Sequence, residues 1–339
     1  MSHDNDLFAD AAREVLADQC SPEVVRAIEA HGNAAPETAA LWEQLEATGL
    51  ADAMLAEEQG GAGLGLGAVF GVLEQCGAHA LPLPLADTML VRAMLAASSV
   101  DKPAGRIVLA SGMRVDSGIS APLVRNARVA QSVLLQVDGE SRLLGLEGAT
   151  LGDQALALDA AVQWSHAQWQ SARVVQAGAD VRTAQAAVVA AQMAGALKTV
   201  FDRTLQYANE RQQFGRPIGK FQAIQHQLAV MSEHVFASRM AAQLGCSGAG
   251  IVPDRLRVAT GKARCSQAAL AVSETAHAIH GAIGFTEEYD LQLFTRRLHA
   301  WRQTAGSEAY WHNVAGAALL DAQGLTLDVI RRITDVETA

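Results

Sequence analysis

The chain has 339 residues, of which 50% are hydrophobic and 18% are charged. This composition is typical of a globular protein and excludes a disordered chain, and the length is sufficient for two or three packed units. The formal net charge of −10 argues against a general surface for nucleic acid or anionic membranes. It does not exclude an anionic small ligand, because local Arg and Lys residues can bind one.

The cysteines and the apolar segments indicate where the protein works. The widely spaced cysteines form no C-x-x-C pair: Cys20, Cys76, Cys246 and Cys265. They are typical of buried, reduced thiols in a cytosolic protein. The polar, acidic N-terminus MSHDNDLFAD does not resemble a signal peptide, and the most apolar window, residues 186–197, is too short to span a membrane and is followed by Lys198. We therefore expect a cytoplasmic protein without membrane insertion.

Residues 1–103 predict an N-terminal helical domain. Ser21-Pro22-Glu23 combines an N-cap, a first-turn proline and an early acid, and Pro36-Glu37 begins a second helix. The glycine-rich stretch at 60–63 lacks the G-K-[ST] of a phosphate loop, so it is interpreted as a turn between helices. Further helices are expected around residues 69–76 and 87–97.

Residues 104–176 predict a small middle β domain. Strand-like runs occupy residues 106–109, 132–137, 142–146 and 171–175. Asp138-Gly139 between the second and third runs is a strong signal for a hairpin turn.

Residues 177–339 predict a C-terminal helical bundle. Long runs rich in Ala and Leu cover about 181–209, 219–245, 253–280, 287–302 and 307–322, and short breaks join them. The expected fold is therefore mainly α with a small β domain.

Two segments of the bundle carry specific patterns, YANERQQFGRPIGKFQAIQHQLA at 207–229 and HGAIGFTEEYDLQLFTRR at 280–297. Together they resemble the C-terminal bundle of the acyl-CoA dehydrogenase flavoproteins. EEQGGAGLG at 57–65 is similar to a P-E-x-x-G-G-x-G turn of that family. The resemblance implies an N-terminal helical domain, a middle domain like a β-barrel but reduced in size, and a C-terminal four-helix bundle.

The first segment has the chemistry of an anion site. Arg211 stands at a helix end beside Gly215, where backbone can approach a ligand, and its guanidinium can hold a pyrophosphate with two hydrogen bonds. Phe214 adds an apolar face and Gln222 an amide. A solvated helical corner with a surface arginine is the alternative. The resemblance implies that Arg211, Phe214 and Gln222 contact FAD of the neighbouring subunit in a dimer.

The second segment resembles the family's Gly-Gly-x-Gly turn, which receives the adenosine end of the same FAD. The turn here is Gly281-Ala282-Ile283-Gly284, and the position where the family has Gln is Ala278. The resemblance implies FAD contacts for Gly281 and Gly284, and also for Ser307, which matches a Thr or Ser of the family.

His277 and His280 lie three residues apart on one predicted helix, a spacing that metal ligands can have. No neighbouring carboxylate or thiol completes a ligand set. We therefore predict packing or capping roles for these histidines and no metal site.

The positions that carry the catalytic base in the family hold other residues here. Acyl-CoA dehydrogenases remove the Cα proton with a glutamate in a dry pocket and transfer a hydride from Cβ to the flavin. In most members that glutamate matches Ala305, and in a minority it matches Gln185. Glu308 is a weak substitute, because a shift of three residues moves a carboxylate roughly 4–5 Å along a helix axis. An acid in the first turn of a helix, where it complements the dipole, is the simpler interpretation.

The middle segment also lacks the T-E-P-x-x-G-S-D and W-I-T-N-G stretches that surround the flavin and the thioester in the family, and Trp164 and Trp169 stand outside any such pattern. The sequence thus resembles the short subunits of heteromeric, α2β2 acyl-CoA dehydrogenases, such as those acting on steroid-CoA thioesters in bacteria. This implies a homologous catalytic partner, FAD shared with or held mainly by that partner, an acyl-CoA substrate and electron-transfer flavoprotein as acceptor. The alternatives are a self-sufficient dehydrogenase with a relocated base and a flavin-free acyl-CoA-binding or scaffold protein.

Overall fold

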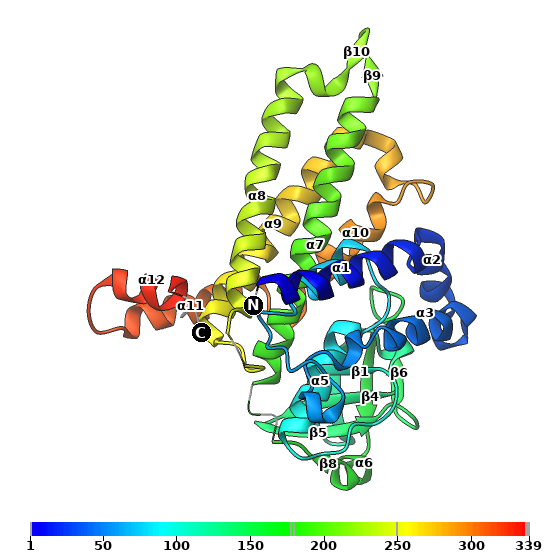
Figure 1. The fold of residues 1–339 in the computed structure, drawn as a ribbon, viewed down its shortest axis with the longest axis vertical. Coiled ribbons are helices and arrows are strands. Elements are labelled where there is room, and N and C mark those ends of the chain that lie inside the picture. The colour runs from blue at the N-terminus through cyan, green and yellow to red at the C-terminus, as the bar shows by residue number, and fades with distance from the viewer. Residues whose placement is uncertain (1, 177, 179, 249, 336–339) are drawn as a thin grey trace.

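The computed structural model describes residues 2–176, 178, 180–248 and 250–335 (Figure 1). Helices precede and follow a region of strands, and the last helices form a long bundle that extends away from the strands. The expected fold class, mainly α with a small β domain, is confirmed.

The first helices form a layer beside the bundle. Their bounds are α1 Ser2–Gln19, α2 Pro22–His31, α3 Pro36–Ala47, α4 Phe70–Ala78 and α5 Leu85–Ala97. Ser21 caps α2 by accepting a hydrogen bond from the amide of Val24, with Pro22 in the first turn, as the sequence predicted. The glycine-rich stretch at 60–63 forms a turn that directly follows a short 3₁₀ helix at Glu57–Gln59.

The middle region consists of two four-stranded sheets and one short helix. The bounds are β1 Ile107–Ser111, β2 Met113–Val115, β3 Gly118–Val124, β4 Ser132–Val137, β5 Glu140–Gly145, β6 Thr150–Gly152, β7 Ala160–Trp164, α6 His166–Ser171 and β8 Arg173–Val174. One sheet has the order β1-β4-β5-β8, with β1 and β4 parallel, and the other has the order β2-β3-β7-β6. Asp138 and Gly139 both have positive φ in the predicted hairpin turn between β4 and β5.

The strand predictions were incomplete. The run at 171–175 forms only the two-residue strand β8, because the capping box of Ser165 and Gln168 starts helix α6, which ends at Ser171. Strands β2, β3, β6 and β7 were not predicted. They are short or contain Gly and Pro, which weakens the alternating pattern on which such predictions depend.

The side chains of β1 connect the middle region to the helices. Ile107 and Leu109 belong to the core shared with the N-terminal helices and the bundle, whereas Val108 and Ala110 belong to the core between the two sheets. Successive side chains of a strand point to opposite faces, so one buried strand contributes to both cores. The middle region is therefore packed directly against the helices.

The bundle alternates in direction. Its bounds are α7 Val181–Glu210, α8 Gln222–Cys246, α9 Arg255–His280, α10 Leu291–Gln303, α11 Glu308–Asp321 and α12 Thr326–Thr334. At one end Arg255 pairs with Asp180 at 2.6 Å, and at the other end the Tyr207 hydroxyl donates to the carbonyl of His280 at 3.3 Å. Helices α7 and α9 are thus parallel and end at the same end of the bundle, and α8 and α10 run the other way (Figure 1). The run predicted at 307–322 corresponds to α11.

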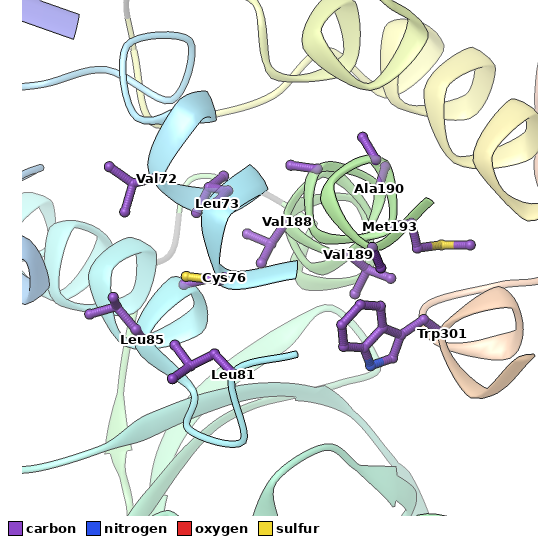
Figure 2. Close-up of a cluster of buried hydrophobic side chains, with 14 of the residues drawn as sticks. Val72, Leu73, Cys76, Leu81, Leu85, Val188, Val189, Ala190, Met193 and Trp301 are labelled. Atoms are coloured by element: carbon purple, nitrogen blue, oxygen red, sulfur yellow. The ribbon is translucent and has the colours of Figure 1, made fainter. Parts of the chain in front are cut away.

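Helix α7 is the centre of the molecule. Val188 lies on the side of α7 that faces α4, Val189 points toward Trp301 of α10, and Met193 points to the side away from α4 (Figure 2). By length and composition α7 could cross a membrane, and it is longer than the apolar window suggested, but 83% of that stretch is buried inside the protein. It is a core helix. The predicted burial of the cysteines is also confirmed, since all of them are free and buried.

Candidate functional site

A hairpin at the outer end of α7 presents the first sequence motif. Arg211 caps α7, and the two-residue strands β9 Gln212–Gln213 and β10 Arg216–Pro217 follow it. Phe214 and Gly215 form the turn with φ of 51° and 75°. Phe214 is 90% exposed and its backbone is in the left-handed region, which is costly for a bulky residue. The Phe214 ring meets the Phe221 ring edge-on at 6.1 Å between centroids, and most of its surface is open to contact with another molecule.

The second motif lies at the end of α9. Gly281 caps the helix with φ of 67°, and a Cβ atom there would meet nothing within 4 Å. A 3₁₀ helix, Gly281–Phe285, continues the chain. Gly281 is thus required by its backbone conformation, and the space beside it is open.

The two motifs line one open pocket of about 690 Å³. Arg211 and Phe214 contribute from the hairpin, and Ala278, Gly281 and Ala282 contribute from the end of α9. They meet because α7 and α9 are parallel and their ends lie together. The Tyr207 ring stacks on the His280 ring at 4.4 Å between centroids and holds the two helix ends in contact.

The remaining predicted cofactor residues lie elsewhere. Gln222 is the exposed first residue of α8, outside the set that lines the pocket. Gly284 is buried, and a Cβ atom there would come within 3.1–3.2 Å of His277, His280 and Leu291, so this glycine permits close packing. Ser307 is at the opposite end of the bundle, where it caps α11.

The inner end of the bundle contains the turn between α10 and α11. Ala305 has φ of 57° and Gly306 has φ of 107°. The indole nitrogen of the fully buried Trp311 donates to the Ala305 carbonyl at 3.1 Å. The residue that the family resemblance aligns with the base therefore carries a methyl group, in a turn that the buried Trp311 contacts.

The Gln185 side chain forms a hydrogen bond between the bundle and the middle region. The side chain is buried near the start of α7, and its amide nitrogen donates to the Leu109 carbonyl of β1 at 2.6 Å. This bond joins the bundle to the middle region. An amide in this position has no lone pair suited to abstract a proton.

Glu308 is paired with Arg302. The guanidinium donates to both carboxylate oxygens, with one contact at 3.0 Å from Nε. Partial burial by itself raises the pKa of Glu308, but hydrogen bonds from Arg302 and the backbone, with the Arg302 charge, hold that pKa below its usual value. A base for Cα needs the opposite shift, so this arrangement favours the interpretation of Glu308 as a first-turn acid.

Sequence reasoning missed one titratable group that faces a hollow. Asp159 lines a cavity of about 450 Å³ between the middle region and α10. Burial raises its pKa, although the Asn126 amide donates to the carboxylate and Arg125 and Arg297 oppose the shift. Only the tertiary packing creates this environment, because Asp159 follows no motif. Its bond to Asn126 fixes the loop before β7.

The two histidines are packed as expected. His277 Nε2 lies 2.9 Å from the Thr295 hydroxyl, and its ring stacks on Phe285. His280 contacts the Ala276 carbonyl and the Tyr289 hydroxyl. Within residues 2–176, 178, 180–248 and 250–335, no group of three or more possible metal ligands occurs.

Comparison with known proteins identifies the fold family. Residues 2–102 match the model for the N-terminal domain of acyl-CoA dehydrogenases, and residues 182–320 match the model for the C-terminal domain. The acyl-CoA dehydrogenase IpdE2 of Mycolicibacterium smegmatis is 30% identical over 309 residues, which are 90% of this chain and 96% of that protein. IpdE2 of Mycobacterium tuberculosis is 28% identical over 304 residues, 88% of this chain and 91% of that protein.

Solved structures agree on the fold. The ChsE4-ChsE5 complex of Mycobacterium tuberculosis aligns with a TM-score of 0.80 and 18% identity over 96% of this chain and 99% of the matched chain. The steroid acyl-CoA dehydrogenase Tcur3481-Tcur3483, in a G363A variant, aligns with a TM-score of 0.79 and 22% identity over 94% of this chain and 98% of the matched chain. With matches at both ends of the sequence and a relative similar over nearly its whole length, this chain belongs to the acyl-CoA dehydrogenase family.

Proposed function

We propose that this chain is a subunit of a heteromeric, FAD-dependent acyl-CoA dehydrogenase. It pairs with a homologous catalytic subunit, which holds most of the FAD and supplies the catalytic base and the main acyl-CoA pocket. This chain lends the outer pocket around Arg211 and Gly281 to that FAD. The reaction is the α,β-desaturation of an acyl-CoA thioester.

The observation that carries the proposal is the convergence of two distant motifs on one open pocket. Arg211 is exposed, and among the described residues its side chain has no ion-pair partner. Phe214 is almost fully exposed in a strained turn. A free guanidinium, an apolar ring and a glycine with open space beside it fit the pyrophosphate and adenosine parts of a dinucleotide.

FAD, when bound, supplies the hydride acceptor for the desaturation. The residues of this chain would bind and orient its distal part: Arg211 would neutralise pyrophosphate charge, and Phe214 would cover an apolar face and exclude water. Gly281 would let the α9 backbone approach the adenosine. Ala278 lacks the amide of the family's Gln, so we expect most of the binding free energy on this side to come from Arg211.

The inner end of the bundle does not fit a complete reaction centre. Ala305 and Gln185 occupy the base positions, and Glu308 is held as a paired carboxylate. Between the middle region and the bundle lies the buried Arg125, which donates to Gln192 at 2.7 Å and stacks over Trp301. Arg125 and Trp301 thus fill the part of this junction beside Gln192, and the cavity of about 450 Å³ that Asp159 lines remains beside α10.

Two further parts of the proposal depend on relatives and composition. The ChsE4-ChsE5 neighbour is described as a complex, which supports a heteromeric assembly, for which we propose α2β2 with fewer flavins than subunits. Electron-transfer flavoprotein is the proposed acceptor, and the cytoplasm is the proposed location. The acyl group remains unassigned, with fatty and steroid side-chain thioesters as the first candidates.

The experiment is co-expression of this chain with a homologous acyl-CoA dehydrogenase from the same organism that carries a glutamate at the base position. We expect a stable complex that contains FAD and oxidises an acyl-CoA thioester, with little flavin or activity in either chain alone. K198A is the matched control for variants of the complex that remove a charge, because among the described residues Lys198 pairs with Asp202 on its own helix and with no other acid.

Each alternative has its own outcome. Full flavin loading and turnover by the isolated chain would support a self-sufficient dehydrogenase and contradict the proposal. A complex that co-purifies without flavin absorbance would support a scaffold or acyl-CoA-binding role. Activity of the complex that survives replacement of the partner's glutamate would place the base in this chain.

A further inference from the structure

A second cavity, of about 450 Å³, lies between the middle region and helix α10. Its volume is within the usual range for small-molecule sites, and among the described residues it shares no lining residue with the outer pocket. Leu123 and Leu156 of the middle region and Ala300 of α10 give it an apolar lining. The cavity can therefore hold a hydrocarbon chain.

The length of the cavity limits the length of that chain. Two of its lining residues, Arg296 and Gln303, are seven positions apart on α10, so the cavity extends about 10 Å along that helix. An extended chain of single bonds advances about 1.2 Å per bond, so roughly eight carbon atoms span this distance.

Asp159 places a carboxyl group in the wall of this cavity. The residue is only 4% exposed, and one of its oxygen atoms accepts a hydrogen bond from the Asn126 amide at 2.9 Å. Among the described residues, the other oxygen atom has no hydrogen-bond partner. Water can bond to this atom, and a ligand that displaces the water must offer a hydrogen bond in its place.

The surroundings of Asp159 favour a hydroxyl group over an amine as that partner. Burial raises the pKa of Asp159, although the positively charged Arg125 and Arg297 nearby oppose the shift. The same two charges oppose the approach of an ammonium group. A hydroxyl group is neutral, and it can donate to a carboxylate or accept from a carboxylic acid, so it suits either form of Asp159.

Arg296 supplies a positive charge to the same cavity. Among the described lining residues it is the only lysine or arginine, and Asp159 is the only acid. The Arg296 side chain is 53% exposed and lies 3.4 Å from Glu29, which is closer to the buried Arg297, at 3.0 Å. Such an exposed pair contributes little, so the Arg296 guanidinium is available to a carboxylate.

We propose that this cavity binds an aliphatic hydroxy acid. The carbon chain contacts the apolar lining, the hydroxyl group bonds to Asp159, and the carboxylate pairs with Arg296. No catalytic step is assigned to the site. The proposal does not depend on FAD, on the outer pocket or on a partner subunit.

The test is isothermal titration calorimetry of the full chain with ω-hydroxyoctanoate and with octanoate. The two probes share the carboxylate and the carbon chain, and they differ in the hydroxyl group. We expect ω-hydroxyoctanoate to bind roughly 10-fold more tightly, because octanoate leaves an oxygen atom of Asp159 without a partner. Titrations at two temperatures detect binding even where the enthalpy is near zero at one of them.

Four variants locate the bound probe. R296Q should weaken binding of both probes roughly 3- to 10-fold and keep the preference for the hydroxyl group. D159A should abolish that preference, and A300F should abolish binding of both probes by filling the cavity. R13Q is the matched control for R296Q, because Arg13 is also an exposed arginine beside one acid, Asp10, and both probes should bind it as they bind the wild type.

The outcomes decide the proposal. It is overturned if neither probe binds at millimolar concentration, if the two probes bind equally, or if binding survives A300F. Equal losses in R13Q and R296Q would contradict a specific carboxylate contact. If A300F or D159A does not fold, R296Q decides, since it changes an exposed side chain and unchanged affinity would contradict the site.

Discussion

The two ends of the bundle are built on the same helices but differ in how their polar groups are satisfied. At the outer end Arg211 and Phe214 stand in solvent around an open pocket. At the inner end Gln185 and Lys262 are buried, and their hydrogen bonds go to backbone and side chains of this chain. The outer end thus leaves a guanidinium and an aromatic ring available to another molecule, whereas Gln185 and Lys262 at the inner end are satisfied within this chain.

The largest expected effect is at the inner end. Q185E should destabilise the chain by roughly 3 kcal/mol at neutral pH, because it replaces the donor to the Leu109 carbonyl with a buried carboxylate. This loss of unfolding free energy should become smaller toward pH 5, since a protonated glutamic acid can donate to the Leu109 carbonyl again. Chemical denaturation at pH 5 and pH 8 measures it. Equal stability to the wild type at pH 8 would mean that the inner end is not closed as described.

The next effect is at the outer end. R211A should weaken FAD retention by the proposed complex roughly 10- to 100-fold, which corresponds to the loss of charge-assisted hydrogen bonds to phosphate. The melting temperature of the isolated chain should not change, because the side chain makes no hydrogen bond or ion pair in the part of the chain that is described. Flavin titration of the complex, with K198A as control, measures the loss. If K198A weakens FAD retention as much as R211A does, the result would contradict a specific binding site at Arg211.

Phe214 allows a test in which stability and binding move in opposite directions. Asn tolerates left-handed backbone better than Phe, so F214N should stabilise the isolated chain by about 0.5 kcal/mol. It should also weaken FAD retention by a factor of roughly 3 to 10, because an aromatic face is lost. Thermal unfolding and flavin titration give the two values. Unchanged flavin retention would show that Phe214 serves only the hairpin.

The smallest effect is expected at Glu308. E308Q should leave turnover of the complex within about two-fold and destabilise the chain by roughly 0.5–1 kcal/mol through loss of the Arg302 pair. Because the pKa of Glu308 is lowered by folding, this contribution is present above the ordinary pKa of 4.5 and is lost as pH falls through the lowered value. Melting curves at pH 7 and pH 3.5 check the sign. Abolished turnover would instead support a relocated base.

The sequence predicted the long helices well and the small strands poorly. Helices α7 and α9 have acidic N-caps, Asp180 and Asp254, and long Ala-rich runs, so their bounds were predicted to within two residues. Strand β3 contains a glycine at one end and Pro122 within it, and its hydrophobic pattern is too short to separate from a loop. Helix α12 was not predicted, since the last predicted helical run ended at residue 322.

The site was predicted in its parts but not in its geometry. The family resemblance implied that the motifs at 211–215 and 281–284 contact the same FAD, but neither motif by itself shows how the two come together. The alternating directions of α7, α8 and α9 bring the two motifs together, since the first and third helices of an up-and-down bundle end on the same side. The environments of Lys262 and Asp159 were not predictable, because burial among distant elements creates them.

The length of α7 has a consequence for how the two chains of the proposed enzyme evolve. About 38 Å of helix separates Gln185 from the outer end of α7, so a mutation at one end leaves the chemistry of the other untouched. In a dimer in which each flavin site takes one end from each chain, a chain that has lost its inner end still sustains its partner's site. Selection on such a pair then acts on opposite ends of two related sequences. Each chain can accumulate substitutions at the end of its bundle that the shared flavin site does not require, because the partner chain supplies that part of the site.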